Sequence, residues 1–315
     1  MPSPNHSTPT NQLSPPRSLN VLIFEYVTAG GLSTHNLSQS LVSEGKMMID
    51  ALLANFATLK TVNVCVMEKE DSLTLDESFK KQIQNMDAVW VIAPEFDGIL
   101  ETFCNYVENA GKKLLTSPSH AVAIAANKLD TFKRLKAAQI PTVPTELFNQ
   151  GHFYDESREW IIKPIDGAGA ENTFLMTSTE NWKALTPLDK QFIIQPYIDG
   201  DKLSLSCIFN HGDAVLLCVN LQIFDVKNRC FYLKTIHVHE REDKNGDYQK
   251  IASQVARAFP DLWGYVGIDL IQTAQACLVL EINPRLTTSF AQIESKLGIN
   301  VAKMVMSLCY DSSLF

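Results

Sequence analysis

The sequence predicts an α/β fold in which a doubly wound parallel-sheet domain is followed by a part with α+β character. Apolar strand-like runs alternate with helical patterns up to about residue 119, which is typical of a parallel sheet covered by helices. After that point the strands become shorter and their turns are rich in Gly, Asp and Asn, which favours antiparallel sheet. With 315 residues, 45% of them hydrophobic, the chain can bury a large core.

The N-terminal part is expected to be a tail followed by one domain. Residues 1–18, "MPSPNHSTPTNQLSPPRS", have no apolar segment, so we expect a disordered tail rather than a signal peptide. Residues 19–119 are expected to form the N-terminal α/β domain. Its strands are predicted at 21–24, 62–68, 87–95 and 113–118, and its helices at 37–59, 75–86 and 98–111.

Two further subdomains are expected, a central one over residues 120–200 and a C-terminal one over residues 201–315. One long amphipathic helix is predicted at 119–139, and Pro141 and Pro144 break the pattern after it. Strands are predicted at 159–165, 172–177, 191–198, 202–210, 214–226, 230–240, 266–272 and 277–283.

Charge and cysteine content narrow the class of protein. A formal net charge of −8 argues against a nucleic-acid partner or an anionic membrane, because both need a basic face. No apolar stretch approaches the roughly 20 residues of a transmembrane helix. The seven cysteines are scattered and none forms a CxxC pair, as expected for reduced thiols in a cytoplasmic protein.

A small-residue loop follows the predicted strand at 159–165. The strand ends near Lys163, and the loop "DGAGA" runs from Asp166 to Ala170. Small residues let backbone N–H groups approach an anion closely, and the lysine adds positive charge, so we predict a phosphate-binding loop. The loop is neither GxxxxGK[ST] nor a dinucleotide fingerprint. Taken alone, the stretch is equally compatible with a plain hairpin turn.

Two carboxylates interrupt the last apolar runs. Asp269 and Glu281 lie twelve positions apart around the polar turn "TAQA", a natural spacing for a hairpin that sets two inward residues side by side. Asn283 shares a strand face with Glu281, and such oxygen ligands suit Mg²⁺ bound together with nucleotide phosphates. Arg285 can pair with a phosphate or a carboxylate. Solvent-facing strand ends with surface ion pairs are the alternative.

In this order, the segments resemble the ATP-grasp carboxylate–amine ligases. The resemblance rests on Lys128 followed by "IPTVPT", on Lys163 with its loop, on "FIIQPYIDGD", and on "GIDL" with "LEINPRLTTSF". It covers nearly everything after the tail, from about Leu19 to Cys309. It implies an ATP-grasp fold after the N-terminal domain, ATP with two magnesium ions as cofactors, and Mn²⁺ as an alternative ion.

The resemblance also implies a role for each matching residue. Lys128 and Lys163 would hold the α- and β-phosphates, residues 166–170 would form a mobile flap, and residues 195–198 would present a backbone hinge to adenine. The implied nucleotide-binding set is Lys128, Lys163, Asp166, Gly167, Ala168, Gly169, Gln195, Pro196, Tyr197, Ile198 and Asp201. The implied metal ligands are Asp269, Glu281 and Asn283, and the implied catalytic residues are Arg285, for the transferring phosphate, and Lys163.

The chain departs from the family pattern at three places. The flap at 166–170 has fewer glycines than the commonest form of the family. Pro196 stands in the hinge and has no N–H, although its carbonyl can still accept from adenine. Asp201 and Lys202 follow Gly200, where the family has the acidic residue that binds ribose, and the residue that takes this part is left open.

The opening "LIFEYVTAGGL" is similar to the start of the tyramine–glutamate ligases of methanofuran biosynthesis, and the related cofactor methylofuran would need an equivalent step. Glu25 ends the first strand at the sheet edge where ligands bind, and we expect it to bind an amine cation. Gly30 and Gly31 are expected to supply backbone donors; a tight turn is the alternative. The implied substrates are small molecules, glutamate with tyramine or tyrosine. A homodimer is one option for the oligomeric state.

Two other functions stay open. One is an ATP-grasp ligase with another acceptor, such as a dipeptide ligase, a protein-tail glutamate ligase or a carboxylase. The other is a nucleotide-binding module without ligase activity, to which the departures at Pro196 and Lys202 point. The chain has no GxSxG motif and no Cys/His pair, so a covalent nucleophile is not predicted.

Overall fold

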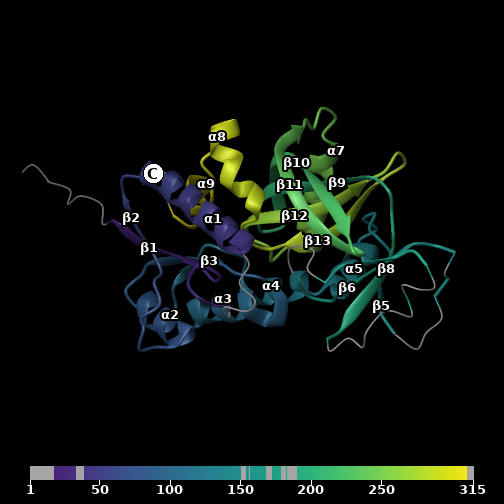
Figure 1. The fold of residues 1–315 in the computed structure, drawn as a ribbon. Coiled ribbons are helices and arrows are strands. Elements are labelled where there is room, and N and C mark those ends of the chain that lie inside the picture. The colour runs from purple at the N-terminus through teal and green to yellow at the C-terminus, as the bar shows by residue number, and fades with distance from the viewer. Residues whose placement is uncertain are drawn as a thin grey trace, which may run out of the picture.

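The computed structural model describes residues 18–32, 39–149, 154–155, 157–167, 172–178, 182 and 190–310. Within these ranges the chain forms a four-stranded sheet near the N-terminus and a nine-stranded sheet after it (Figure 1). The predicted tail lies outside the described residues except for Ser18. No described helix has the length and apolar character needed to cross a membrane.

The N-terminal sheet has the strand order β2-β1-β3-β4, and every pair in it is parallel. Its strands are β1 (Leu19–Glu25), β2 (Val62–Val66), β3 (Ala88–Ile92) and β4 (Lys113–Leu114). Its helices are α1 (Gln39–Ala57), α2 (Leu75–Ile83) and α3 (Ile99–Asn109), and the short 3-10 turn η1 (Phe96–Gly98) precedes α3. The predicted alternation of strands and helices is confirmed.

Helices cover both faces of this sheet. Val21 and Ile23 of β1 belong to the core that includes α1, whereas Leu22 and Phe24 belong to the core that includes α2 and α3. Because side chains alternate along a strand, β1 needs apolar residues at every position to be buried on both faces. The doubly wound arrangement predicted from the continuous apolar run is therefore confirmed.

The single helix predicted at 119–139 is wrong, because the chain forms two helices there. They are α4 (Ser119–Ala126) and α5 (Lys128–Ala137). Asn127 between them has an extended backbone, and its Oδ1 accepts hydrogen bonds from the N–H groups of Leu129 and Asp130 at 3.0 and 3.1 Å. This N-cap starts a new helix at Lys128, whose N–H donates to Ile165 O at 2.9 Å.

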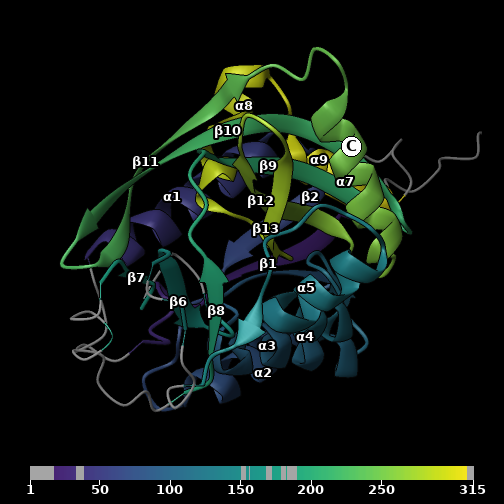
Figure 2. The same ribbon diagram turned by 90° about the vertical axis from the view of Figure 1, so that its right-hand side faces the viewer.

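The second sheet has the order β13-β12-β9-β10-β11-β7-β6-β8-β5, and its neighbouring strands are antiparallel. The strands are β5 (Glu146–Leu147), β6 (Trp160–Pro164), β7 (Phe174–Met176), β8 (Phe192–Pro196), β9 (Asp201–Asn210), β10 (Asp213–Lys227), β11 (Cys230–Arg241), β12 (Gly264–Gln272) and β13 (Cys277–Asn283). Figure 2 shows β10 and β11 arching across towards β7. The predicted change to antiparallel sheet is confirmed.

The two edge strands of this sheet are joined through the segment before β5. Thr142 forms a parallel bridge with Val279 of β13, and Val279 N–H donates to Pro141 O at 2.9 Å. The nine-stranded sheet therefore curls until its opposite ends face one another. This curvature brings side chains from β6 and β13 into one place, although β6 and β13 lie far apart in the strand order.

The strands β9 and β12 separate two cores. Leu203, Leu205 and Cys207 pack on one face with α4, α5 and α7 (Asp247–Ala258). The opposite face packs at one end against α1, α8 (Ile293–Leu297) and α9 (Val301–Cys309), next to the 3-10 turn η2 (Thr288–Gln292). At its other end that second face is polar, with Ser204 and Ser206 of β9 on it. We call this second face the polar face.

Gly200 before β9 is a position where a side chain cannot fit. Its φ is +155°, and a Cβ would lie 2.5 Å from the backbone oxygen of Gln272. We expect Gly200→Ala to destabilise the protein more than Gly246→Ala, whose φ is +74° with no atom within 4 Å of the added Cβ. The Gly246 control should lose about 1 kcal/mol from left-handed strain alone. Chemical denaturation measures both, and equal losses would contradict the close contact.

Candidate functional site

The last hairpin brings together the residues predicted to hold a metal ion. In the antiparallel pair of β12 and β13, Asp269 lies directly opposite Glu281, so the predicted hairpin is confirmed. Asn283 Nδ2 donates to Asp269 Oδ2 at 3.0 Å. Gln222 of β10, which the sequence did not indicate, donates from Nε2 to Asp269 Oδ1 at 3.2 Å.

Both predicted lysines reach this hairpin. Lys163 Nζ lies 3.2 Å from Glu281 Oε2, and Lys128 Nζ lies 3.9 Å from the same oxygen. Each lysine side chain is only 8% exposed, so the charges are largely removed from water. Lys128 Nζ also donates to Gly167 O at 3.0 Å, which connects the start of the predicted phosphate loop to the cluster. Ala168 and Gly169 lie outside the described residues.

The two carboxylates are in different electrostatic states. Burial, together with the neighbouring charge of Glu281, raises the pKa of Asp269 to about 7. Burial also acts to raise the pKa of Glu281, but the charges of Lys163 and Lys128 outweigh it and hold that pKa at about 2. Glu281 is therefore ionised and paired with lysines, whereas for Asp269 the effect of the Lys163 charge is smaller than the effects of burial and of Glu281.

The donor set fits a magnesium ion bound with phosphates. Two carboxylates and an amide oxygen are hard oxygen ligands, and Mg²⁺ commonly takes one or two carboxylates together with substrate phosphates. The described ranges contain no group of three or more His, Cys, Asp or Glu side chains that could hold a metal. The ligand roles of Asp269, Glu281 and Asn283 stay predictions.

Arg285 connects the hairpin to the N-terminal domain. Its Nη2 donates to Glu95 Oε2 at 2.7 Å, and its Nη1 donates to Leu286 O at 3.0 Å. Glu95 is 4% exposed and follows β3 at the carboxyl edge of the parallel sheet. The sequence analysis missed Glu95, although its place after an apolar strand is where open α/β sheets bind ligands.

The segment after β3 also contacts the start of the predicted flap. Asp97 N–H donates to Asp166 Oδ2 at 2.9 Å, and Asp97 Oδ1 accepts from Lys190 Nζ at 2.5 Å. Asp97 has a φ of 54°, which is uncommon for a residue with a side chain. The segment from Glu95 to Asp97 therefore contacts two parts of the predicted site. Glu95 contacts Arg285, which follows the hairpin of β12 and β13, and Asp97 contacts Asp166 in the predicted phosphate-binding loop.

The predicted hinge lies at the end of β8. Gln195 is buried and donates from Nε2 to Thr145 Oγ1 at 2.8 Å. Tyr197 N–H donates to Glu159 O at 2.9 Å, so the alternation of an antiparallel ladder directs the Pro196 carbonyl away from β6. Lys202 Nζ donates to Ile198 O at 2.9 Å and to Gly200 O at 3.0 Å, which fixes the turn after the hinge.

Asp201 is placed differently from the nucleotide contact predicted for it. Ser204 lies opposite Asp269, and the alternation along β9 puts Lys202 on the same polar face and Asp201 on the other face. The Asp201 carboxylate forms an ion pair with Arg241. The prediction for Asp201 is therefore not supported by the geometry, and Lys202 is the residue of this pair that faces the site.

The turn after β1 uses its own backbone donors. Gly30 N–H donates to Val27 O at 3.1 Å and Gly31 N–H to Tyr26 O at 2.8 Å, as in the tight turn that was the alternative, and a substrate role for these two residues stays a prediction. The Glu25 carboxylate accepts from Val27 N–H at 3.2 Å and from Thr28 N–H at 2.7 Å. Burial raises the pKa of Glu25 despite these bonds. An amine-binding role for Glu25 stays a prediction.

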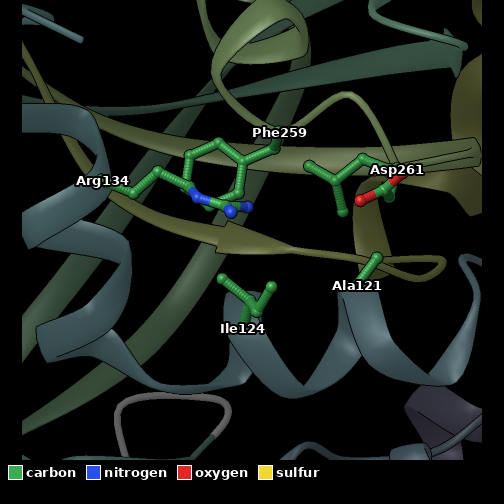
Figure 3. Close-up of a pocket in the computed structure, with 6 residues that line it drawn as sticks. Ala121, Ile124, Arg134, Phe259 and Asp261 are labelled. Carbon is green, nitrogen blue, oxygen red and sulfur yellow. The ribbon is translucent and has the colours of Figure 1, made fainter. Parts of the chain in front are cut away.

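A separate pocket carries none of these residues. It lies between α4, α5 and the segment after α7, and Figure 3 shows Arg134 alongside the Phe259 ring there. Its empty volume of about 170 Å³ includes open solvent. A ligand pocket typically has ~300 Å³ or more, so this hollow is too small to hold a nucleotide.

Comparisons with known proteins agree with the geometry. An ATP-grasp domain model matches residues 125–289, which is about half of the chain, and a pre ATP-grasp 3 domain model matches residues 46–122. The chain belongs to the ATP-grasp family. The predicted family, fold and class, an ATP-dependent C–N ligase, are confirmed. Proteins of this family bind ATP with divalent metal ions, and the number of ions stays a prediction.

The chain is similar to two curated proteins over most of its length. It is 29% identical to the tyramine--L-glutamate ligase of Methanocaldococcus jannaschii, over 85% of this chain and 83% of that protein. It is 26% identical to the tyramine--L-glutamate ligase of Methanocaldococcus fervens, over 88% and 90% respectively.

Solved structures share the fold. A putative ATP-grasp superfamily protein from Archaeoglobus fulgidus has a TM-score of 0.70 and 25% identity, covering 92% of this chain and 88% of that one. D-alanine--D-alanine ligase from Bacillus anthracis has a TM-score of 0.68, over 94% of this chain and 97% of that one. At 14% identity this second likeness concerns the fold alone.

We expect Glu281→Gln to remain folded but to lose ATP turnover by more than about a hundredfold, because a metal ligand and the lysine partner disappear together. Removing the partner of two buried lysines should also lower the free energy of unfolding by about 3 kcal/mol. The control is Glu240→Gln, an exposed carboxylate on β11. Chemical denaturation and ADP release measure the two effects. Normal turnover by the folded variant would remove Glu281 from the site.

Without magnesium, stability should fall as pH rises between about 4 and about 7. The folded-state pKa of Asp269, about 7, lies above its ordinary value of 3.8, so in this window the folded protein retains a proton that the unfolded chain releases. Asp269→Asn should lack this dependence, and the exposed-site control Asp71→Asn should keep it. Thermal unfolding against pH in EDTA tests the prediction, and parallel profiles for wild type and Asp269→Asn would contradict it.

Proposed function

We propose that this ATP-grasp ligase joins glutamate to tyramine or tyrosine through an acyl-phosphate intermediate, in methanofuran- or methylofuran-type cofactor biosynthesis. The observation that carries the proposal is the buried cluster in which Lys128 and Lys163 meet Glu281 beside Asp269. The substrate choice is supported by the similarity to the two tyramine--L-glutamate ligases.

The first step transfers the γ-phosphoryl group of ATP to a substrate carboxylate. Lys128 and Lys163 are positioned to exchange Glu281 for phosphate oxygens, which keeps both buried charges paired. Asp269, Glu281 and Asn283 would hold magnesium, which would neutralise phosphate charge. Positioning and charge neutralisation dominate such transfers, so the chain needs no covalent nucleophile.

The second step forms the amide. The bond between the β,γ-bridging oxygen of ATP and the γ-phosphorus has broken, which releases ADP, and the acyl phosphate now carries that phosphoryl group. An amine attacks the acyl carbon, the C–N bond forms, the C–O bond to phosphate breaks, and the nitrogen loses a proton. Arg285, largely buried beside the hairpin, is placed to stabilise the charge on the transferring and departing phosphate.

The hinge supports adenine binding through its backbone. The Pro196 carbonyl is directed away from β6, where it can accept a hydrogen bond from an exocyclic amine. Lys202 holds the turn that follows, through the carbonyls of Ile198 and Gly200. Pro196 therefore does not argue against nucleotide binding. The seven cysteines are all free thiols, which fits action in the cytoplasm, where ATP is available.

An ADP-release screen tests the proposal. Purified protein with Mg²⁺ and ATP should release ADP only when L-glutamate is present together with tyramine or tyrosine, and EDTA should abolish the signal. Other amino acids and amines at the same concentration serve as controls. A signal with a different pair would keep the ligase and replace the substrates. ADP formation that does not depend on an amine would contradict a ligase, and no response to any pair would favour a binding module.

A further inference from the structure

Carboxylates of the N-terminal domain gather opposite the segment that follows β13. Glu95 pairs with Arg285 at 2.7 Å, and Glu44 Oε2 of α1 accepts from Thr288 Oγ1 at 3.0 Å. Glu25 lies close enough to Arg285 for the arginine charge to lower the carboxylate's pKa, although burial dominates and raises it. The border between the domains therefore has two carboxylates, Glu95 and Glu25, near the Arg285 guanidinium group.

Two atoms at this border lack hydrogen-bond partners. Among the described residues, Glu95 Oε1 and Arg285 Nε are buried side-chain polar atoms without a partner. Glu95 is 4% exposed, so bulk water does not reach its carboxylate freely. Both atoms belong to the ion pair of Glu95 with Arg285. In that pair the hydrogen bond joins only Arg285 Nη2 and Glu95 Oε2. A buried charged group with an unmet hydrogen bond is costly unless a ligand completes it.

Arg285 follows by two residues Asn283, whose amide donates to Asp269, so the unpartnered atoms lie close to the cluster of Asp269, Glu281 and the two lysines. Burial lowers the pKa of Lys128, and the charges of Glu281 and Glu95 both act against that effect. The charges of Asp269 and Glu281 likewise act on Arg285. A group bound between Glu95 and Arg285 therefore lies next to the place where the phosphoryl group is transferred.

The chemistry of the two atoms specifies the ligand. A carboxylate oxygen accepts, so Glu95 Oε1 requires a donor, and because Glu25 adds a second carboxylate near Arg285 that donor should be a cation. Arg285 Nε donates, so it requires an anionic oxygen. An amino acid carries an ammonium group and a carboxylate in one small molecule. A dicarboxylate without an ammonium group would leave Glu95 Oε1 without a donor and would be repelled by the Glu95 charge.

We infer that Glu95 binds the ammonium group of an amino-acid substrate through Oε1, while Arg285 Nε donates to an anionic oxygen of the same molecule. The inference rests on the proposed function and deepens it, because it makes the carboxylate donor an amino acid and names the residue that selects it. Before phosphoryl transfer this anionic oxygen belongs to the substrate carboxylate, and after transfer it belongs to the acyl phosphate.

The test compares L-glutamate with glutarate, which lacks only the ammonium group. Wild-type protein receives ATP, Mg²⁺ and hydroxylamine, which traps an acyl phosphate as a hydroxamate and makes the assay independent of the natural amine. We expect kcat/KM to be about a hundredfold higher for L-glutamate than for glutarate, in line with a charged hydrogen bond. This comparison needs no variant, so it stays decisive even if a substitution at Glu95 impairs folding.

Glu95→Gln then assigns the selectivity to one residue. The amide can still accept from Arg285 Nη2, but it carries no charge for an ammonium group. We expect KM for L-glutamate to rise about a hundredfold, the preference for L-glutamate over glutarate to disappear, and the Kd for ATP to be unchanged. The matched control is Glu101→Gln, an exposed carboxylate on α3, which should retain the wild-type preference.

Each outcome decides the inference. Equal rates with L-glutamate and glutarate, or a Glu95→Gln variant that alters only the ATP or amine constants, would overturn it. If a different amino acid drives turnover, the same comparison is made with its deaminated acid. A preference for the aminated form that Glu95→Gln abolishes would then support the inference, although glutamate would be wrong as the substrate. The inference would be overturned if only carboxylates without an ammonium group were turned over. It would also be overturned if no amino acid gave a response.

Discussion

The contact of Glu281 with Lys163 and Lys128 is the interaction on which the rest of the structure depends. The three residues come from β13, β6 and the first turn of α5, and the lysine nitrogens lie 3.2 and 3.9 Å from one carboxylate oxygen. Buried charges must be paired, so the nine-stranded sheet has to curl until its ends meet. The bridge between Thr142 and Val279 joins those ends. The ion pairs of the site can therefore form only when the sheet is curved.

The segment after β3 gives the N-terminal domain a direct part in the site. Glu95 contacts Arg285 after the metal hairpin, and two residues later Asp97 contacts Asp166 at the start of the phosphate loop. Asp97 keeps a φ of 54°, and uncommon backbone angles of this kind cluster at functional sites. Because one short segment contacts Arg285 and Asp166, a substrate at Glu95 and a phosphate at the loop, as proposed, would be positioned relative to each other.

Patterns that depend on local geometry could be predicted from the sequence. The twelve-residue spacing of Asp269 and Glu281 is set by the two-residue period of strands, and the register pairs them as expected. The break at Asn127 was missed because a capping asparagine inside an apolar helical pattern looks like an ordinary polar position. The sequence could not show which of Asp201 and Lys202 faces the site, because a one-residue shift in register moves every side chain of a strand to the other face. Glu95 and Gln222 reach the site only through tertiary packing, which no local pattern encodes.

The most direct test of the central claim is a crystal structure with ATP analogue and Mn²⁺, located by its anomalous signal. The account predicts manganese in contact with the carboxylates of Asp269 and Glu281, and phosphate oxygens beside the nitrogens of Lys128 and Lys163. It also predicts adenine at the backbone of Pro196. A nucleotide bound elsewhere, or manganese that contacts neither carboxylate, would contradict it.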